Sequence, residues 1–369
     1  MNLLIYVPQM AAYGGMEQHV CLLAVLLAQK GHVVAMMTTS NSLNEASRAK
    51  LQAAGIQLRE LSVARGNATK AGKLVWLLLN ALLLRGKSWD VIYTNGQSGL
   101  ARLVWLAGGS KTRIVHHHHT AGDSAEQRTW HPAFRRTLAA SPELVACSDS
   151  TKRHLNATLN RVDTLFLSYL TPEMLPSIAV KEKSYSPESV LHFGFTGRLV
   201  STKGIDTICN LSREPALGSV RWHIHGSGEG YPESFFEAFP NVSYHGPYNG
   251  PGECGDILQG LDALALFSRH NEGMPLSLIE GMAAGLPWIA TDQGGTRELA
   301  VAAENCEVLP AQATFEEVTM RLLDLVGRIR HKQTSRVAQR RAYDDRFAPQ
   351  IVAEHWLDFL IRPARSITV

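Results

Sequence analysis

The sequence lacks the features of a secreted or disulfide-stabilised protein. It has 369 residues but only five cysteines, which are scattered and never spaced as CxxC. This pattern excludes a disulfide framework and a cysteine zinc site, and it predicts a protein of a reducing compartment. The first ten residues, MNLLIYVPQM, have no basic segment of the kind that opens a signal peptide. We therefore expect a cytoplasmic protein.

The sequence also lacks nucleic-acid-binding signatures and long hydrophobic runs. Zinc-finger spacing, a basic heptad region and an RNP-like motif are all missing, so we expect no nucleic-acid partner. The longest apolar run, 74–84, spans 11 residues with Asn80 inside it, whereas a membrane-spanning helix needs about 20. The composition, with 45% hydrophobic and 19% charged residues, is that of an ordinary globular protein.

The net charge of +3 is unevenly distributed along the chain. Residues 1–168 contain 18 Lys and Arg against 9 Asp and Glu, whereas residues 169–369 contain 18 against 24. A basic N-terminal half indicates an anionic surface or substrate for that half. The apolar run 74–84 lies within the segment 70–87, which is either a core helix or an interfacial helix in contact with an anionic membrane. The cations that flank the run are Lys70, Lys73, Arg85 and Lys87.

Short apolar runs alternate with amphipathic stretches, which is typical of parallel sheets covered by helices. Between the first two predicted strands, apolar residues recur at helical spacing from Met16 to Leu27. The Pro- and Ser-rich stretch 171–189 predicts an interdomain linker, and 349–361 predicts a last helix. The predicted strands are 3–8, 33–39, 90–95, 113–118 and 144–148 in the first half, and 190–197, 220–226, 242–246, 262–268, 287–291 and 306–310 in the second.

Two segments that follow predicted strands carry residues suited to anion binding. Gly14 and Gly15 precede the first helix, where glycines and free N–H groups let an anion approach the backbone. Arg198 and Lys203 follow the strand 190–197, where Arg198 could hold a diphosphate by a forked contact and Lys203 as a point charge. Taken alone, these motifs fit a tight turn and a pair of solvated loop cations equally well.

The most specific segment is EGMPLSLIE, which runs from Glu272 to Glu280. Pro275 is predicted at the first helical position, where its missing N–H costs nothing. Glu272 then precedes the helix, and the N–H groups of Leu276 and Ser277 lie in its first turn. Glu280 follows about one turn further in. Two carboxylates around a helix N-terminus suit a ligand that carries both hydroxyls and phosphate.

Together, these segments resemble the GT4 family of glycosyltransferases. The resemblance rests on Gly-Gly-x-Glu after the first strand, Gly-Arg-Leu…Lys-Gly at 197–204, Gly-Ser-Gly at 226–228, and Glu-x7-Glu before Ala-Ala-Gly-x-Pro. It covers nearly the whole chain in order. It implies an α/β GT-B fold, with two Rossmann-like domains facing across a cleft and the C-terminal helix crossing back to the first domain. The implied domains are 1–170 with 349–369, and 190–348, joined by the linker 171–189.

The resemblance also implies roles for individual residues. Glu272 would contact hydroxyls of the donor sugar, and Glu280 would hold the nucleotide ribose. Arg198 and Lys203 would clamp the diphosphate, so that no metal ion or other cofactor is expected. The other donor-binding positions implied are Gly15, Gly226, Ser227, Gly273, Met274, Leu276 and Ser277.

Four consecutive histidines, 116–119, lie at the end of the predicted strand 113–118. Neighbouring side chains in a strand point to opposite faces, so at most two of the four could share one metal ion. The family often carries His-Thr or His-Gly at the end of this strand, and His119-Thr120 matches best. The resemblance thus places His119 in the active site, with His118 as the alternative because the register within the run is ambiguous.

We predict a retaining, metal-independent glycosyltransferase that moves a sugar from a UDP- or GDP-linked donor to a hydroxyl. The basic first half favours a glycan or lipid-linked acceptor, in lipopolysaccharide or exopolysaccharide synthesis at the inner face of the cytoplasmic membrane. The alternatives are a nucleotide-sugar epimerase of GT-B-like fold and a non-catalytic nucleotide-sugar-binding protein. The sequence departs from the family at Ser168 and Tyr169, where many relatives have an Asn-Gly-Val-Asp turn, and at Met274. Hinge geometry and donor sugar therefore stay open.

Overall fold

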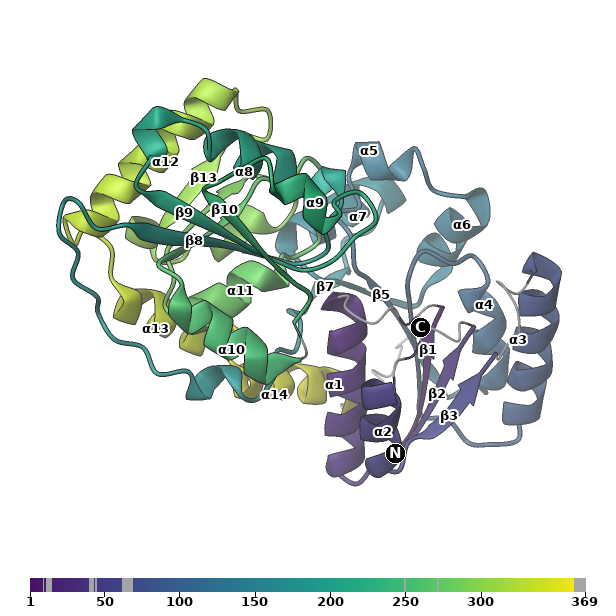
Figure 1. Ribbon diagram of the computed structural model, residues 1–369. Coiled ribbons are helices and arrows are strands. Elements are labelled where there is room, and N and C mark those ends of the chain that lie inside the picture. Colours follow the sequence, from purple (N-terminus) through teal and green to yellow (C-terminus); the bar gives the residue numbers. More distant parts are fainter. Residues whose placement is uncertain are drawn as a thin grey trace. The chain divides into compact units, whose positions relative to one another are not determined.

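The computed structural model describes residues 1–8, 10, 15–39, 43, 45–61, 69–248, 250–270 and 272–361. The chain divides into two compact units, one formed by Met1–Leu170 with Val352–Val369 and the other by Thr171–Ile351. Each unit contains one sheet in which all neighbouring strands are parallel (Figure 1). The predicted two-domain α/β class is therefore confirmed.

The first unit has a seven-stranded sheet in the order β3-β2-β1-β4-β5-β6-β7. The sequence predicted five of these strands and missed β3 and β7. Both are short strands at the sheet edges, with no fully buried residue, so neither produces a strong apolar signal. The strands are β1 (Asn2–Val7), β2 (Val33–Thr38), β3 (Gln57–Glu60), β4 (Val91–Asn95), β5 (Arg113–His118), β6 (Glu143–Ala146) and β7 (Leu165–Phe166).

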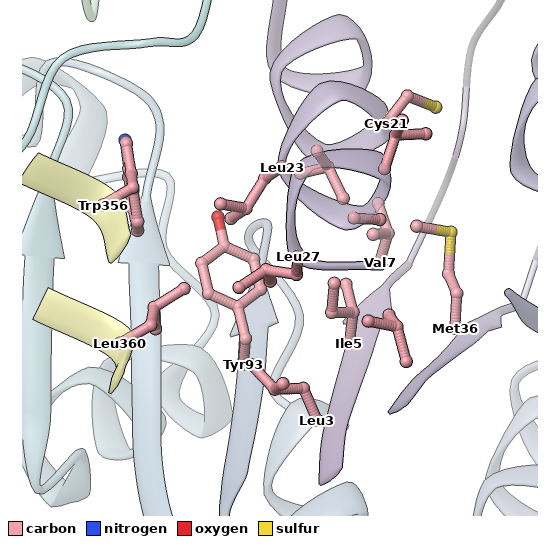
Figure 2. Packing of buried hydrophobic residues seen from close by; sticks show 14 of the residues in the cluster. Leu3, Ile5, Val7, Cys21, Leu23, Leu27, Met36, Tyr93, Trp356 and Leu360 are labelled. Carbon is pink, nitrogen blue, oxygen red and sulfur yellow. The ribbon is translucent and has the colours of Figure 1, made fainter. Parts of the chain in front are cut away.

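The helices of the first unit cover both faces of its sheet. One face carries α1 (Gly15–Gln29), α2 (Glu45–Ala53) and the part of α14 (Pro349–Ile361) that belongs to this unit. The other face carries α3 (Lys70–Leu84), α4 (Ala101–Val104), α6 (Pro132–Ala140) and α7 (Asp149–Leu159), while α5 spans Ser124–Gln127. Figure 2 shows Leu23 and Leu27 of α1 packed over the strands, with Trp356 from α14 in the same cluster.

The second unit has a six-stranded sheet in the order β10-β9-β8-β11-β12-β13, and all six strands were predicted. Its predicted linker, 171–189, contains only the 3-10 turn Leu175–Ser177. The strands are β8 (Leu191–Thr196), β9 (Val220–His225), β10 (Val242–Gly246), β11 (Ala263–Leu266), β12 (Trp288–Thr291) and β13 (Cys306–Leu309). The helices are α8 (Ile205–Leu211), α9 (Glu233–Phe236), α10 (Pro251–Gly260), α11 (Leu276–Ala283), α12 (Phe315–Arg330) and α13 (Arg336–Arg346).

Helix α3 answers the question that the 70–87 segment left open. Leu77, Ala81 and Leu84 are buried in a cluster with α4, so one face of the helix belongs to the core. The opposite face is exposed, with Leu79 at 55% and Leu83 at 71% of full exposure. The core interpretation is therefore right for one face and wrong for the other. Among the described residues, no helix is both long and apolar enough to span a bilayer.

Candidate active site

In the second unit, the loops after β8 and β11 are held in close contact. Because all strands are parallel, these loops emerge at the carboxyl edge of the sheet, where ligands bind in α/β folds. Gly204 follows the 3-10 turn Ser201–Lys203 with φ of +74°, and a Cβ atom there would lie 2.1 Å from the Phe267 carbonyl oxygen. The backbone N–H of Arg269 also donates to the Thr202 carbonyl at 2.7 Å. Only glycine fits this crossing, which brings Lys203 against the β11 loop.

The carboxylate of Glu272 is the centre of this contact. Its Oε1 accepts hydrogen bonds from Lys203 Nζ at 2.6 Å and Ser268 Oγ at 2.5 Å, and His270 Nε2 lies 3.9 Å away. The residue is only 7% exposed. Burial alone would raise the pKa of Glu272, but the Lys203 ammonium, His270 and the two hydrogen bonds hold it below its usual value. The group is therefore a charged, oriented carboxylate at neutral pH.

The loop after β12 holds the backbone of Glu272 in place. The Gly295 N–H donates to the Glu272 carbonyl at 3.3 Å. Gly294 has φ of +56°, and a Cβ atom there would lie 1.6 Å from the same carbonyl oxygen. Thr291 Oγ1 donates to the Ser268 carbonyl at 2.6 Å. This bond also fixes the backbone of Ser268, whose hydroxyl donates to Glu272. Three loops therefore position one carboxylate.

Glu272 is followed by the short helix α11, as the sequence predicted, with one correction. Pro275 is the N-cap residue, with ψ of 101°, and not the first helical residue. Its carbonyl accepts from the N–H groups of Leu278 and Ile279 and so starts the helix one position later. The N–H groups of Leu276 and Ser277 lie in the first turn, where a helix favours negative charge. Gly273 and Met274, between Glu272 and the cap, are buried.

Glu280, one turn into α11, has a different environment. It is 7% exposed, and Cys254 Sγ lies 3.9 Å from its Oε2. Burial raises the pKa of Glu280 to about 7. Tyr248 lies close enough for the charge of Glu280 to contribute to the raised pKa of the phenol, although burial is the main cause. Glu280 is thus a carboxylate poorly supplied with donors, in contrast to Glu272.

The remaining predicted positions of this unit flank the same sheet edge. Arg198, after β8, is exposed, and its guanidinium makes no hydrogen bond or ion pair with another described residue. Gly226, after β9, is buried and donates its N–H to the Gly246 carbonyl at 2.8 Å, while its own carbonyl accepts from Tyr244 Oη at 3.0 Å. Ser227 is exposed. Arg198 and Ser227 are therefore free to contact a ligand.

In the first unit, His119 lies just beyond β5 and its ring is fixed by Tyr169. Tyr169 Oη donates to the His119 carbonyl at 3.0 Å and lies 3.2 Å from His119 Nδ1. Because the tyrosine proton is used on the carbonyl, the arrangement assigns the proton of the neutral imidazole to Nδ1. Burial and the nearby His19 hold the pKa of His119 well below its usual value. Its Nε2, which has no partner within the described residues, is then a bare acceptor.

The other members of the histidine run alternate between faces, as expected for a strand. His117 packs on His119 with ring centroids 3.9 Å apart, whereas His118 faces the other way and places Nε2 3.3 Å from Glu126 Oε1. Within the described ranges, no cluster of His, Cys, Asp or Glu could hold a metal ion. Gly15 is the first residue of α1, and Gly14 lies outside the described residues.

Sequence reasoning missed four residues that shape these sites. Ser268 ends the predicted strand 262–268, and His270 lies two residues beyond it. Their position at the carboxyl end of a strand was therefore a signal that the sequence offered. Cys254 gave no signal, and Tyr169 was noted only as a departure from the family, because only tertiary packing brings them to Glu280 and His119.

Two protein-family models match the chain, one in each unit. The model described as Glycosyltransferase Family 4 matches residues 13–163, and the model described as Glycosyl transferases group 1 matches residues 191–327. A GDP-mannose-dependent alpha-mannosyltransferase of Mycobacterium tuberculosis is 31% identical over 176 residues, or 47% of this chain. The match spans 44% of that relative's length.

Solved structures share the fold over almost the whole chain. HepE from Anabaena, in complex with UDP and glucose, has a TM-score of 0.73 at 14% identity, covering 98% of this chain and 99% of its own. The apo lipopolysaccharide outer core galactosyltransferase WaaB has a TM-score of 0.74 at 15% identity, with the same coverage. Sucrose-phosphate synthase from Thermosynechococcus elongatus has a TM-score of 0.75 at 16% identity, covering 97% of this chain and 98% of its own. These likenesses confirm the predicted GT-B fold.

The Lys203–Glu272 pair yields a pH-dependent stability prediction. Replacing Lys203 by Met leaves a buried carboxylate without its cation, which should lower the free energy of unfolding by about 3–5 kcal/mol at pH 7. The folded-state pKa of Glu272 lies below its usual value of 4.5, so the stability it contributes is present above pH 4.5 and lost as the pH falls below it. Urea unfolding should therefore show a difference between wild type and Lys203→Met that shrinks below pH 4.5.

The matched control for this stability prediction is the double variant Lys203→Met/Glu272→Gln, which removes the buried charge and should regain much of the loss. A difference of equal size at pH 7 and pH 4 would contradict an electrostatic origin.

The Tyr169–His119 contact yields a spectroscopic prediction. In Tyr169→Phe, His119 Nδ1 loses its acceptor, so the imidazole should no longer be held in the form protonated at Nδ1. Long-range 1H–15N NMR on histidine-labelled protein should show one fixed tautomer in wild type and a shift toward protonated Nε2 in the variant. Tyr248→Phe, far from His119 in sequence and in the other unit, serves as the control. An unchanged tautomer in Tyr169→Phe would refute the assignment.

Proposed function

The chain belongs to the GT4 family of group 1 glycosyltransferases, and from this premise we propose that it transfers a sugar from a nucleotide diphosphate sugar to a hydroxyl acceptor. The proposal depends on one observation, the environment of the Glu272 carboxylate. Its carboxylate is charged at neutral pH and is oriented through one oxygen by Lys203 and Ser268. A fixed carboxylate at the carboxyl edge of a parallel sheet is a strong acceptor for sugar hydroxyls.

Arg198 and Lys203 are proposed to neutralise the donor diphosphate. A lysine ammonium has three donors, of which Lys203 uses one on Glu272, so it can bind phosphate without leaving the carboxylate. The N–H groups of Leu276 and Ser277 add the positive end of the α11 dipole. Negative charge builds on the diphosphate as its bond to the anomeric carbon breaks, and fixed cations stabilise that charge. In this proposal the reaction needs no metal ion, and the family resemblance implies retention at the anomeric carbon.

Glu280 is proposed to bind the ribose of the nucleotide. Its carboxylate is buried, and among the described residues it has only a weak thiol contact, from Cys254. Two neighbouring ribose hydroxyls would supply hydrogen-bond donors that the described residues do not provide. An ionised carboxylate accepts hydrogen bonds from both hydroxyls. Donor binding would therefore favour the ionised form of a group whose pKa is raised to about 7.

The other donor contacts remain proposals from the family resemblance. Gly15 and His119 are the positions implied in the first unit, where the Nε2 atom of His119 is a buried acceptor without a partner among the described residues. Gly226 and Ser227 are proposed for the base, and Gly273 and Met274 for the sugar. The named relatives use or bind different nucleotides, GDP-mannose in one case and UDP in another. Donors linked to UDP or to GDP are therefore the two to test.

The acceptor is proposed to be a lipid-linked glycan in lipopolysaccharide or exopolysaccharide synthesis. The support is the basic N-terminal half, together with a fold shared with a lipopolysaccharide galactosyltransferase. In this proposal the enzyme works at the inner face of the cytoplasmic membrane, which would place it beside such an acceptor.

The proposed role of Glu280 predicts that nucleotide affinity depends on pH. Because the pKa of Glu280 is about 7 in the free protein and binding favours the carboxylate, affinity should rise about tenfold between pH 6 and pH 8. Titration calorimetry with UDP and GDP measures this directly. Glu280→Gln is the matched control, since it keeps the shape and retains only the titration of the nucleotide's own phosphate. An identical pH dependence in both proteins would count against the ribose role.

The proposed reaction is tested by its products. Wild type incubated with UDP- and GDP-sugars, with and without glycan acceptors, should yield free nucleotide diphosphate and a transferred or hydrolysed sugar. Activity should persist in EDTA, and 1H NMR should show retained anomeric configuration. An isomerised nucleotide sugar would identify an epimerase instead. Donor binding with no turnover under any condition would identify a binding protein.

A further inference from the structure

Helix α3 exposes a continuous apolar face. Six large aliphatic side chains on it are between 39% and 71% exposed, although the helix also has a fully buried face. They recur in neighbouring pairs four residues apart, so they occupy one side of the helix over nearly its whole length. The six are Leu74, Val75, Leu78, Leu79, Leu82 and Leu83, and we refer to them as the α3 face.

The α3 face continues onto the neighbouring segment after β4. Figure 1 shows α3 at the outer side of the first unit with α4 beside it. Leu106, in the 3-10 turn Trp105–Ala107 that packs on α3, is 44% exposed. The guanidinium of Arg102 lies 5.8 Å from the Trp105 ring centroid. The exposed apolar area thus extends over two elements and is bordered by a cation and an aromatic ring. Such a continuous patch is larger than the area that isolated surface leucines expose.

Cations surround the α3 face, and acids are almost missing from its sequence neighbourhood. Between residues 61 and 122 the chain has eight Lys and Arg but one acid, Asp90. Asp90 Oδ2 accepts from the Asn2 backbone N–H at 2.7 Å and is therefore engaged. Lys70 at the start of α3, Arg85 and Lys87 beyond its end, and Arg102 and Lys111 on the adjacent segment are exposed. An apolar stripe with cations at its borders is the pattern of a helix that lies in a membrane interface.

We infer that the α3 face is a docking surface for an anionic lipid bilayer. Charge complementarity selects this occupant, because phosphate headgroups meet the bordering cations while acyl chains receive the leucines. A second copy of the chain would bring its own cations against these in a symmetric contact, which like-charge repulsion opposes. The helix is 15 residues long and lies flat in the interface, with its other face still bound to the core.

The inference concerns binding and not turnover, so it can be tested without donor or acceptor. The full-length protein is mixed with vesicles of phosphatidylcholine alone or with about one third phosphatidylglycerol, and bound protein is measured by flotation. We expect partitioning onto the anionic vesicles to be stronger by about a hundredfold or more, and weakened at high salt because the charges are exposed. Leu79→Ser/Leu83→Ser should reduce partitioning roughly tenfold or more, since its two changed side chains are among the most exposed of the face.

Replacement of Lys70, Lys73, Arg85 and Lys87 by Gln should reduce partitioning onto anionic vesicles by about a hundredfold or more. Arg135, Arg136, Arg341 and Arg346, four exposed cations elsewhere, provide the matched control when changed to Gln. Met320→Ser/Val337→Ser is the control for the apolar pair, because both residues are at least 50% exposed in the second unit. Neither control should change partitioning by more than about twofold.

Three results would overturn the inference. The first is no binding of wild type to anionic vesicles even at low salt, and the second is binding of the α3 variants equal to that of wild type. In the third, light scattering shows a dimer that the leucine variant dissociates, which would make the α3 face a contact between copies. Thermal unfolding midpoints within a few degrees of wild type verify that the variants are folded. Nucleotide binding to the second unit is measured separately, so failure here removes the proposed membrane location but leaves the proposed sugar transfer and donor contacts untouched.

Discussion

The ion pair between Lys203 and Glu272 is the interaction on which the proposed site depends. It joins the loop after β8 to the loop after β11, and the backbone crossing at Gly204 makes that junction possible. Burial to this depth raises the pKa of a carboxylate, as it does for Glu280, and at Glu272 the Lys203 ammonium and the other partners of the carboxylate together more than offset that rise. The same contact therefore fixes the charge of the site and its shape. The loop after β12 completes the site, because the Gly295 N–H donates to the Glu272 carbonyl.

The two glutamates of the EGMPLSLIE segment are chemically distinct although they lie eight residues apart. Glu272 has an ammonium and a hydroxyl on one oxygen and stays ionised, whereas Glu280 has one weak thiol contact and a pKa raised to about 7. Environments that separate the pKa values of two acids commonly mark divided roles. In the proposed mechanism Glu272 is pre-formed for the sugar, and Glu280 becomes fully charged as the ribose binds.

The sequence was sufficient for the class of fold and for the order of the site segments, because parallel strands leave buried apolar runs and ligands bind where those strands end. It was not sufficient for β3 and β7, which are short and carry no such run. The sequence also did not reveal which side chains contact one another. Lys203 was assigned to a diphosphate, yet in the free protein it is bound to Glu272. Tyr169, noted only as a departure from the family, fixes the ring of His119. Such contacts join segments that are far apart in the sequence, so hydrophobic periodicity does not predict them.

In the proposed site, Glu272 recognises the donor sugar and not the nucleotide. The measurement that tests it most directly compares the dissociation constants of a nucleotide diphosphate and its sugar-linked form, in wild type and in Glu272→Gln. A hydrogen bond to a charged group contributes about 1.5–3 kcal/mol. The affinity gained from the sugar should therefore fall about tenfold or more in the variant, while affinity for the nucleotide alone should not fall. Equal losses for both ligands, or none for either, would contradict it.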